Sequence, residues 1–379
     1  MYSEDWSEFW WSHITGSKMV VLKVVEFLLA KSTVILEVPE DLPWRQAMRR
    51  VIEKYFRDES HLMEHIVEII DAADECQGET PGRFLLEHYS PSTEIRLGYR
   101  ERSRKTIQDF IKENGVLKNR VVWVKGLTGT QATDWMNFCR EYNHGSLEDG
   151  LFVLEVHGNV AMQLSKWLNH IRYLDSVTNY DVQLFNSFVL DTNASLTPDW
   201  KKYIATAIAV LCDADAEIAE SMLQFGDLKS VSFKDIVAEL ADAPEYSKRG
   251  ANSASGHLFS YFRSGDIGEI ERRLWKAQVQ VLFPLIEIER RAIIEKYFDV
   301  LQNALQDHYI EQYKKPVKFP IEVEFGTLCY MMKETVNYVY IPDRLDRERI
   351  HFLHDMRNDL AHARPCDPSR VKELLDGQA

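Results

Sequence analysis

Near the C-terminal end of the sequence, the segment Arg357–His362 (RNDLAH) brings together three side chains with complementary chemistry. The imidazole of His362 can take or give a proton near neutral pH. The guanidinium of Arg357 can hold a phosphate and offset the negative charge that builds on it. The carboxamide of Asn358 can hold an imidazole in one orientation. These are the groups that a ribonuclease working without a metal ion needs.

The residues around this segment predict a helix with one buried face. No Gly or Pro occurs from Asp346 to Ala363, and apolar residues recur there at helical spacing. These apolar residues are Ile350, Leu353, Met356 and Leu360. Pro365 is predicted to end the helix, because proline has no N–H with which to continue the hydrogen-bond ladder.

A second, polar stripe of the same helix carries the reactive side chains. His354, Asn358 and His362 are spaced four residues apart, which places them on one face. At about 100° per residue, Arg357 points roughly 140° away from His362. One copy of the helix therefore does not easily direct both groups at one phosphate. The length of the Arg side chain closes part of the gap, and a second copy of the helix would close the rest.

The combination of Arg357, the polar Asn358 and His362 after four intervening residues resembles the Rx4-6H motif of the HEPN superfamily. The resemblance covers about residues 266–379, in which 269–305 form a long helical pattern interrupted only by Pro284 and 327–338 predict another helix. It implies a small all-helical bundle that pairs with a second copy, so that both motifs line one cleft. Many members of this superfamily cut RNA without a metal.

The same resemblance implies a role for each residue of the motif. His362 would act as base or acid on the ribose 2′-OH or the leaving 5′-oxygen, Arg357 would hold the scissile phosphate, and Asn358 would orient the ring or the phosphate. His354 would be a helper, and the product would carry a 2′,3′-cyclic phosphate. Arg364 and Arg349 are the candidate substrate-binding cations, and no cofactor or metal ligand set is expected.

Two other interpretations of the motif stay open. An exposed Arg-Asn-Asp stretch with a histidine can simply be the solvated face of a helix. A HEPN domain can also serve only for dimerisation or partner binding, since some members are thought not to cleave RNA. An RNA-cleavage assay with the purified chain distinguishes a nuclease from these two alternatives.

Charge and composition limit the classes of partner. The net charge of −14 opposes broad binding to nucleic acid, so a nuclease with this balance needs a local basic cleft. The arginine-rich segments 344–370 and 96–105 could supply it, although either could be an ordinary soluble surface. The sequence lacks an apolar run of the roughly 18 residues that span a membrane, and its N-terminus is polar and acidic. The five scattered cysteines form no C-x-x-C pair, which predicts a reduced, cytoplasmic protein.

The first two-thirds of the chain predict a three-layer α/β domain. Buried-strand patterns at 32–38, 65–70, 120–124 and 151–156 alternate with helical stretches, which is typical of parallel βαβ units. Further helices are expected at 159–169 and 199–225 and in the segments that follow. Two domains are therefore predicted, an α/β domain with a helical extension at 1–250 and a HEPN helical bundle at 266–379. The stretch 246–256 is the candidate linker.

This order of elements is similar to that of AAA/STAND ATPases, but the phosphate-binding chemistry is missing. The strand ending at Val38 is followed by two prolines and two acids (PEDLPW), where a P-loop would have glycines and a Lys-Ser/Thr pair. The Gly/Lys patch 16–18 precedes a helix, and the patch 125–130 lacks the Lys-Ser/Thr pair. The sequence favours a P-loop-like fold that has lost nucleotide binding, with a divergent working site or an unrelated α/β domain as alternatives. Glu155, which ends a strand ahead of His157, is interpreted as a strand-end carboxylate.

The function predicted from the whole sequence is metal-independent RNA cleavage by a HEPN homodimer under the control of an N-terminal sensor-like domain. The architecture suggests a setting in antiphage defence, with a partner protein of that system. The alternative is a non-catalytic dimerisation or scaffold protein.

Overall fold

The computed structural model describes residues 5–60, 65–76, 78–100, 105–142, 146–158, 160, 167–251 and 256–377. The chain divides into two compact units, each described by itself below. Unit 1 comprises residues 1–185 and 213–218, and unit 2 comprises residues 186–212 and 219–379. Among the described residues, no helix is both long enough and apolar enough to cross a membrane.

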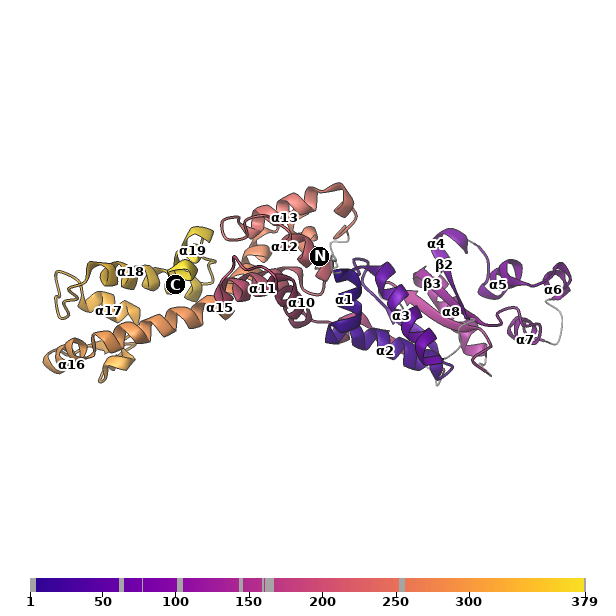
Figure 1. The fold of residues 1–379 in the computed structure, drawn as a ribbon, viewed down its shortest axis with the longest axis horizontal. Coiled ribbons are helices and arrows are strands. Elements are labelled where there is room, and N and C mark those ends of the chain that lie inside the picture. The colour runs from indigo at the N-terminus through magenta and orange to yellow at the C-terminus, as the bar shows by residue number, and fades with distance from the viewer. Residues whose placement is uncertain are drawn as a thin grey trace. The chain divides into compact units, whose positions relative to one another are not determined.

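Unit 1 contains a five-stranded sheet in which every strand pair is parallel, as predicted (Figure 1). The strands are β1 Thr33–Glu37, β2 Ile66–Asp71, β3 Arg120–Leu127, β4 Leu151–Val156 and β5 Leu168–Arg172. Their order across the sheet is β5-β1-β4-β3-β2. The all-parallel sheet confirms the α/β part of the fold prediction.

Helices cover both faces of this sheet, because side chains of successive strand residues alternate between the faces. On one face, Ile35, Val122, Val124, Phe152 and Leu154 form a core with α5, α7 and α8. On the other face, α1, α2 and α3 pack together, and α2 also packs on β1. These helices are α1 Trp6–His13, α2 Thr15–Leu29, α3 Arg45–Ser60, α5 Pro81–Tyr89, α7 Ile107–Glu113 and α8 Gly129–Glu141. The predicted three-layer arrangement is present.

The edge strand β5 was not predicted. The sequence pattern indicated a helix over 159–169, but Leu168–Arg172 pair in parallel with β1. The other residues of that expected helix lie outside the described residues, except 160 and 167. The shorter helices associated with unit 1 are α4 Ala72–Glu75, α6 Thr93–Gly98 and α9 Tyr173–Ser176, and α10 Asn179–Asp191 crosses from unit 1 into unit 2.

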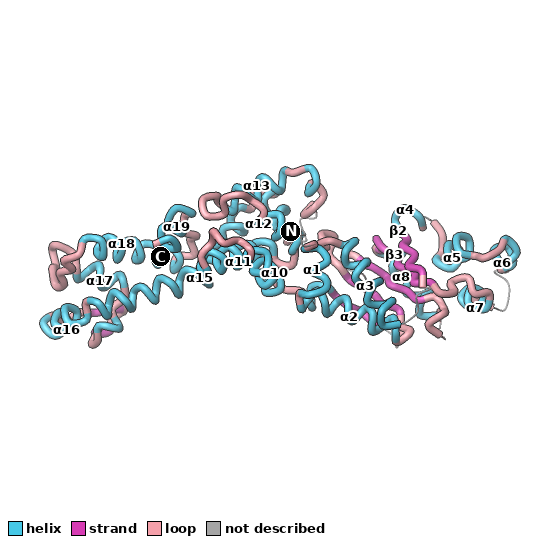
Figure 2. The backbone as a smooth tube through the Cα atoms, in the orientation of Figure 1, coloured by secondary structure: helices cyan, strands magenta, loops and turns pink. Residues whose placement is uncertain are grey.

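Unit 2 is helical, with one short antiparallel strand pair, β6 and β7 (Figure 2). Its elements are α11 Pro198–Cys212, α12 Ala216–Leu223 (which begins in the unit 1 segment), α13 Phe233–Asp242, η1 Pro244–Tyr246, α14 Leu258–Arg263, α15 Ile267–Lys296, α16 Phe298–Asp307, β6 Glu311–Gln312, β7 Lys315–Pro316, η3 Pro320–Glu322, α17 Phe325–Met331, α18 Arg344–Ala361 and α19 Pro368–Asp376. The expected boundary between residues 250 and 266 groups α11 to α13 with the α/β domain. The compact units instead group α11, α13 and most of α12 with the C-terminal helices.

Three of the predicted helices have different limits in the structure. The helix expected over 199–225 is interrupted at Asp213, whose φ of +56° is left-handed and not helical. Pro284 does not break α15, whose neighbouring side chains Leu282 and Ile286 are fully buried. This burial compensates for the one backbone hydrogen bond that proline cannot make. The helix expected over 327–338 stops at Met331, where the chain turns back so that Val339 N–H donates to the Met331 carbonyl at 3.1 Å.

The helix that carries the RNDLAH segment, α18, has the predicted buried stripe. Ile350, Leu353, Met356 and Leu360 are at most 1% exposed, and α18 packs against α15 and α17. The helix ends at Ala361, before Pro365, because Ala363 adopts a left-handed φ of +57°. The Arg364 N–H then donates to the Asp359 carbonyl at 2.9 Å, which closes the last turn.

Replacing Ala363 by Gly tests this helix end. Alanine is disfavoured in the left-handed region, whereas glycine adopts it without steric cost. We expect Ala363→Gly to raise the free energy of unfolding by about 0.5–1 kcal/mol, measured by urea denaturation. The control is Ala361→Gly, at an exposed position inside the same helix, which should be destabilising. If both substitutions change the free energy of unfolding in the same direction, the proposed helix end is contradicted.

Candidate functional site

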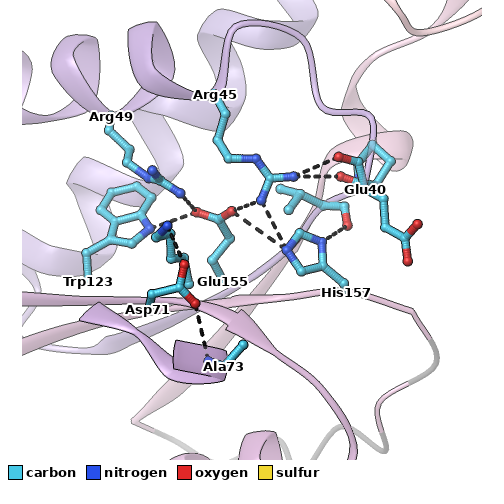
Figure 3. Close-up of polar contacts among 11 residues, drawn as sticks. Glu40, Arg45, Arg49, Asp71, Ala73, Trp123, Glu155 and His157 are labelled. Carbon is cyan, nitrogen blue, oxygen red and sulfur yellow. Dashed lines mark hydrogen bonds and ion pairs between the residues drawn. The ribbon is translucent and has the colours of Figure 1, made fainter. Parts of the chain in front are cut away.

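The carboxyl end of strand β4 holds a buried carboxylate with several cationic or polar partners (Figure 3). Glu155 is fully buried and points toward α3. Its Oε2 accepts from Arg49 Nη2 at 2.7 Å and from Trp123 Nε1 at 2.9 Å, while Oε1 is paired with Arg45. The edge of the sheet at which P-loop proteins bind phosphate is therefore crossed by an internal ion-pair network.

The charges in this network explain its protonation. Burial opposes ionisation of Glu155, but the guanidinium groups of Arg45 and Arg49 outweigh it and hold the pKa of Glu155 below its ordinary value. Burial, followed by the positive charge of Arg45, lowers the pKa of His157. His157 is then neutral at pH 7, with Nδ1–H donating to the Val38 carbonyl at 3.2 Å and Nε2 accepting from Arg45 at 3.1 Å.

The loop after β1 presents acceptors toward Arg45, where a phosphate loop would present donors. Arg45 Nη2 donates to the carbonyl oxygens of Pro39 and Glu40 at 3.2 and 3.0 Å. Trp44 N–H donates to Glu217 at 2.8 Å, and the left-handed φ of Trp44, +42°, is rare for a bulky residue. The described residues of this loop therefore direct carbonyl oxygens at Arg45. They do not present the row of backbone N–H groups that binds an anion.

The two Gly/Lys patches singled out in the sequence have structural roles. Gly16 and Ser17 are buried residues in the first turn of α2, and the Gly16 N–H donates to Asp181 of α10 at 2.8 Å. Lys125 pairs with Asp71 at 2.5 Å, and its hydrogen bond is the main cause of the lowered pKa of Asp71.

In unit 2, two side chains of α15 hold the backbone on either side of His362. Trp275 Nε1 donates to the Leu360 carbonyl at 2.7 Å. Gln278 accepts from Cys366 N–H at 2.6 Å and donates to the Cys366 carbonyl at 3.1 Å. His362 lies between these anchors as the C-terminal cap of α18, with its side chain exposed. Its imidazole is thus on a fixed backbone and open to solvent.

The structure pairs Asn358 with His354, not with His362. Asn358 Nδ2 donates to His354 Nε2 at 3.0 Å, and His354 Nδ1 lies 3.0 Å from Asp355 Oδ1. An Asp355–His354–Asn358 chain therefore fixes the ring orientation and favours the tautomer with the proton on Nδ1. The predicted orienting role of the carboxamide applies to the histidine that the sequence suggested only as a helper.

Arg357 is held by an acidic partner from the segment before α17. Its Nη2 donates to Glu324 Oε2 at 2.9 Å, and the Tyr313 hydroxyl donates to the same oxygen at 2.8 Å. Both side chains of the Arg357–Glu324 pair are partly exposed, so the pair contributes roughly 0.2–1 kcal/mol. A phosphate could displace Glu324 at small cost.

The two predicted substrate-binding arginines have different surroundings. Arg349 makes a bidentate pair with Glu289 of α15 at 2.8 and 2.7 Å, which links α18 to α15. Arg364 is largely exposed and makes one ion pair with Asp359 at 3.1 Å. Arg364 and Arg370 line an open groove of about 460 Å³ together with Phe352, Asp355, Asn358 and Asp359. Arg364 is therefore the better placed of the two for a substrate phosphate.

Sequence reasoning did not identify Glu324 or Asp355 as parts of the site, and it included Arg370 only as a member of the arginine-rich segment 344–370. Asp355 could have been found, because it follows His354 directly. Glu324 is 33 residues before Arg357, and no spacing rule connects them.

Comparison with known proteins gives a distant structural likeness. Among solved structures, the chain is similar to the ORC2 protein of Aeropyrum pernix in its ADPNP–ADP complexes, with 11% sequence identity and a TM-score of 0.31. The match covers 95% of this chain and 92% of that chain. At these values the likeness supports no conclusion about fold or activity. No family model and no curated protein matches the sequence.

The Glu155 network gives a stability prediction. Glu155→Gln keeps the shape but leaves two guanidinium groups near the sheet without their counter-charge, which should lower the free energy of unfolding by about 3 kcal/mol at pH 7. Since the folded-state pKa of Glu155 lies below the unfolded value, this stabilisation is present above about pH 4.3 and is lost as the pH falls through the folded pKa. The difference between wild type and variant should therefore shrink in acid.

The control for that measurement is Glu148→Gln, in which an exposed carboxylate 3.8 Å from Lys118 is neutralised. It should change stability by less than about 1 kcal/mol. Urea denaturation of both variants from pH 7 to pH 3 makes the comparison. An unaltered stability of Glu155→Gln at pH 7 would show that the network is not an essential contact of unit 1.

Proposed function

We propose that unit 2 is a HEPN-type endoribonuclease that cuts RNA without a metal ion, as the RNDLAH segment suggests. The observation that supports this most is the Asp355–His354–Asn358 chain, which orients an imidazole and whose two outer members, Asp355 and Asn358, line an open groove with Arg364 and Arg370. An imidazole with a fixed tautomer, on the same helix as cations that can hold a phosphate, is suited to proton transfer during transesterification of RNA.

In the proposed reaction, one imidazole takes the proton of the ribose 2′-OH while the 2′-oxygen forms a bond to phosphorus. In His354 the accepting atom is Nε2, so the Asn358 amide must first release that nitrogen. The bond from phosphorus to the 5′-oxygen breaks, and that oxygen receives a proton from a second acid. The products are a 2′,3′-cyclic phosphate and a free 5′-OH. His354 and His362 are the two imidazoles of the polar stripe, and Arg357, after exchanging Glu324 for the phosphate, offsets the developing charge.

We further propose that two copies of unit 2 form the active species. Arg357 leaves α18 on a different side from His362, so a single helix does not direct both at one phosphate. A homodimer that brings two α18 helices together would supply the missing group from the second copy. By analogy of architecture, unit 1 would act as a sensor that restrains the nuclease in a cytoplasmic antiphage system, with a partner protein of that system.

The second candidate function is a non-catalytic dimerisation or scaffold module. Exposed aromatic and aliphatic side chains around β6, β7 and η3 favour a protein partner for this part of unit 2. They include Tyr309, Tyr313, Phe319 and Ile321, which are 75%, 72%, 59% and 47% exposed. Such a module would bind its partner with the RNDLAH segment intact but would not cut RNA.

Cleavage of a mixed single-stranded RNA pool by the full chain in excess EDTA tests the proposal. We expect His354→Ala, His362→Ala and Arg357→Ala each to lower the rate by at least about 100-fold, which is the usual loss on removing a proton-transfer or charge-stabilising group. Glu324→Gln should cut faster than wild type, because it removes the carboxylate that competes for Arg357.

Matched controls are His308→Ala, an imidazole that stacks on Tyr338 at 3.9 Å, and Arg272→Ala, an exposed guanidinium on α15. Both should cut at the wild-type rate. If the wild type and Glu324→Gln both leave RNA intact while the chain still dimerises, the scaffold function is the correct one.

A further inference from the structure

Unit 2 contains a cavity that the proposed reaction does not use. It has a volume of about 350 Å³ and lies among α11, the loop that leads into α13, α15 and the segment that follows α18. Small-molecule sites commonly have volumes of roughly 300–1,000 Å³. The cavity is thus large enough for a compact ligand.

The inner wall of the cavity is aromatic. Trp200, Tyr203 and Phe233 line it, and each is at most 6% exposed. The rings of Trp200 and Tyr203 lie 6.1 Å apart, and those of Tyr203 and Phe233 lie 6.0 Å apart. Rings fixed in this way favour a flat, aromatic ligand.

Polar groups of the wall can fix the orientation of such a ring. Gln278 is buried and donates to the Tyr203 hydroxyl at 3.2 Å. Because that hydroxyl accepts this bond, its own proton can be donated to a ligand acceptor. Ser232, at the N-terminal cap of α13, also lines the cavity.

Three cations also line the cavity, namely Lys229, Lys234 and Arg364. Glu271 and Asp367 line the cavity too, but Glu271 is already paired with Lys234. The Lys229 ammonium lies 5.7 Å from the centre of the Trp200 ring, so it remains beside the aromatic wall. Within the described part of the chain, the exposed Arg364 makes one ion pair, with Asp359, so most of its N–H groups remain available for a phosphate.

Arg364 also lines the open groove beside Asn358. One guanidinium therefore borders both the aromatic cavity and the groove lined by Asp355 and Asn358, the two hydrogen-bond partners of His354. A phosphate bound to Arg364 would have an attached base on the side of the cavity and a neighbouring phosphodiester on the side of the groove.

We propose that this cavity binds one unstacked nucleotide, with its base against Trp200, Tyr203 and Phe233 and its phosphate on Arg364. Aromatic side chains commonly hold single-stranded bases in this way. The nucleotide is either free or part of an RNA chain. The RNA case rests on the proposed nuclease function, whereas the free-nucleotide case does not.

Binding to the full chain in EDTA tests the site separately from cleavage. The probes are the four nucleoside monophosphates and a short single-stranded RNA made uncleavable by 2′-deoxy substitution, measured by calorimetry. We expect at least one probe to bind. Val231→Trp, which fills the cavity from its half-buried lining, and Arg364→Ala, which removes an exposed cation, should each weaken that binding about tenfold or more. Arg272→Ala should leave it unchanged.

The outcomes separate the two proposals. Binding of a monophosphate that is sensitive to both changes supports the site even if the chain never cuts RNA. If only the RNA probe binds, and both changes weaken its binding, the cavity is supported as part of a binding site for an RNA chain. The site is overturned if no probe binds, or if binding is the same in wild type and Arg364→Ala, a surface change that does not depend on the folding of Val231→Trp.

Discussion

The burial of one stripe of α18 against its neighbouring helices is the constraint on which the candidate site depends. Each of the four stripe residues that become fully buried contributes roughly 1.5–3 kcal/mol. The ion pair between Arg357 and Glu324 contributes much less, roughly 0.2–1 kcal/mol, because both groups are partly exposed. The face of α18 that meets solvent is therefore fixed by the core, while the partner of Arg357 can change.

In unit 1, the main electrostatic feature is the buried ion-pair network around Glu155. The sheet of this unit is parallel throughout, and the carboxyl end of strand β4 is occupied by Glu155 and the two arginines of α3. The loop after β1 turns its carbonyl groups toward Arg45, so N–H donors that could hold a phosphate are taken by internal acceptors. The sequence-based hypothesis that nucleotide binding has been lost stays a prediction.

The sequence predicted the features that follow from periodicity. Four strands of the sheet and the buried stripe of α18 were visible as alternating or helical apolar patterns. Strand β5 was missed because its sequence, LNHIR, is polar and lies at the sheet edge. In the candidate site, the four-residue spacing placed His354, Asn358 and His362 on one face, but it could not tell which histidine Asn358 contacts. Contacts between distant segments, such as Glu324 with Arg357, have no local pattern and needed the structure.

The chemical form of the RNA ends gives the most direct test of the central claim, that imidazoles on the polar face of α18 drive attack by the ribose 2′-OH. Mass spectrometry of fragments made by the full chain in EDTA would show it. The account predicts 2′,3′-cyclic phosphate and 5′-hydroxyl ends that are absent from the products of an RNA whose 2′-hydroxyls are methylated. Fragments with 3′-hydroxyl and 5′-phosphate ends, or equal cutting of the methylated RNA, would contradict it.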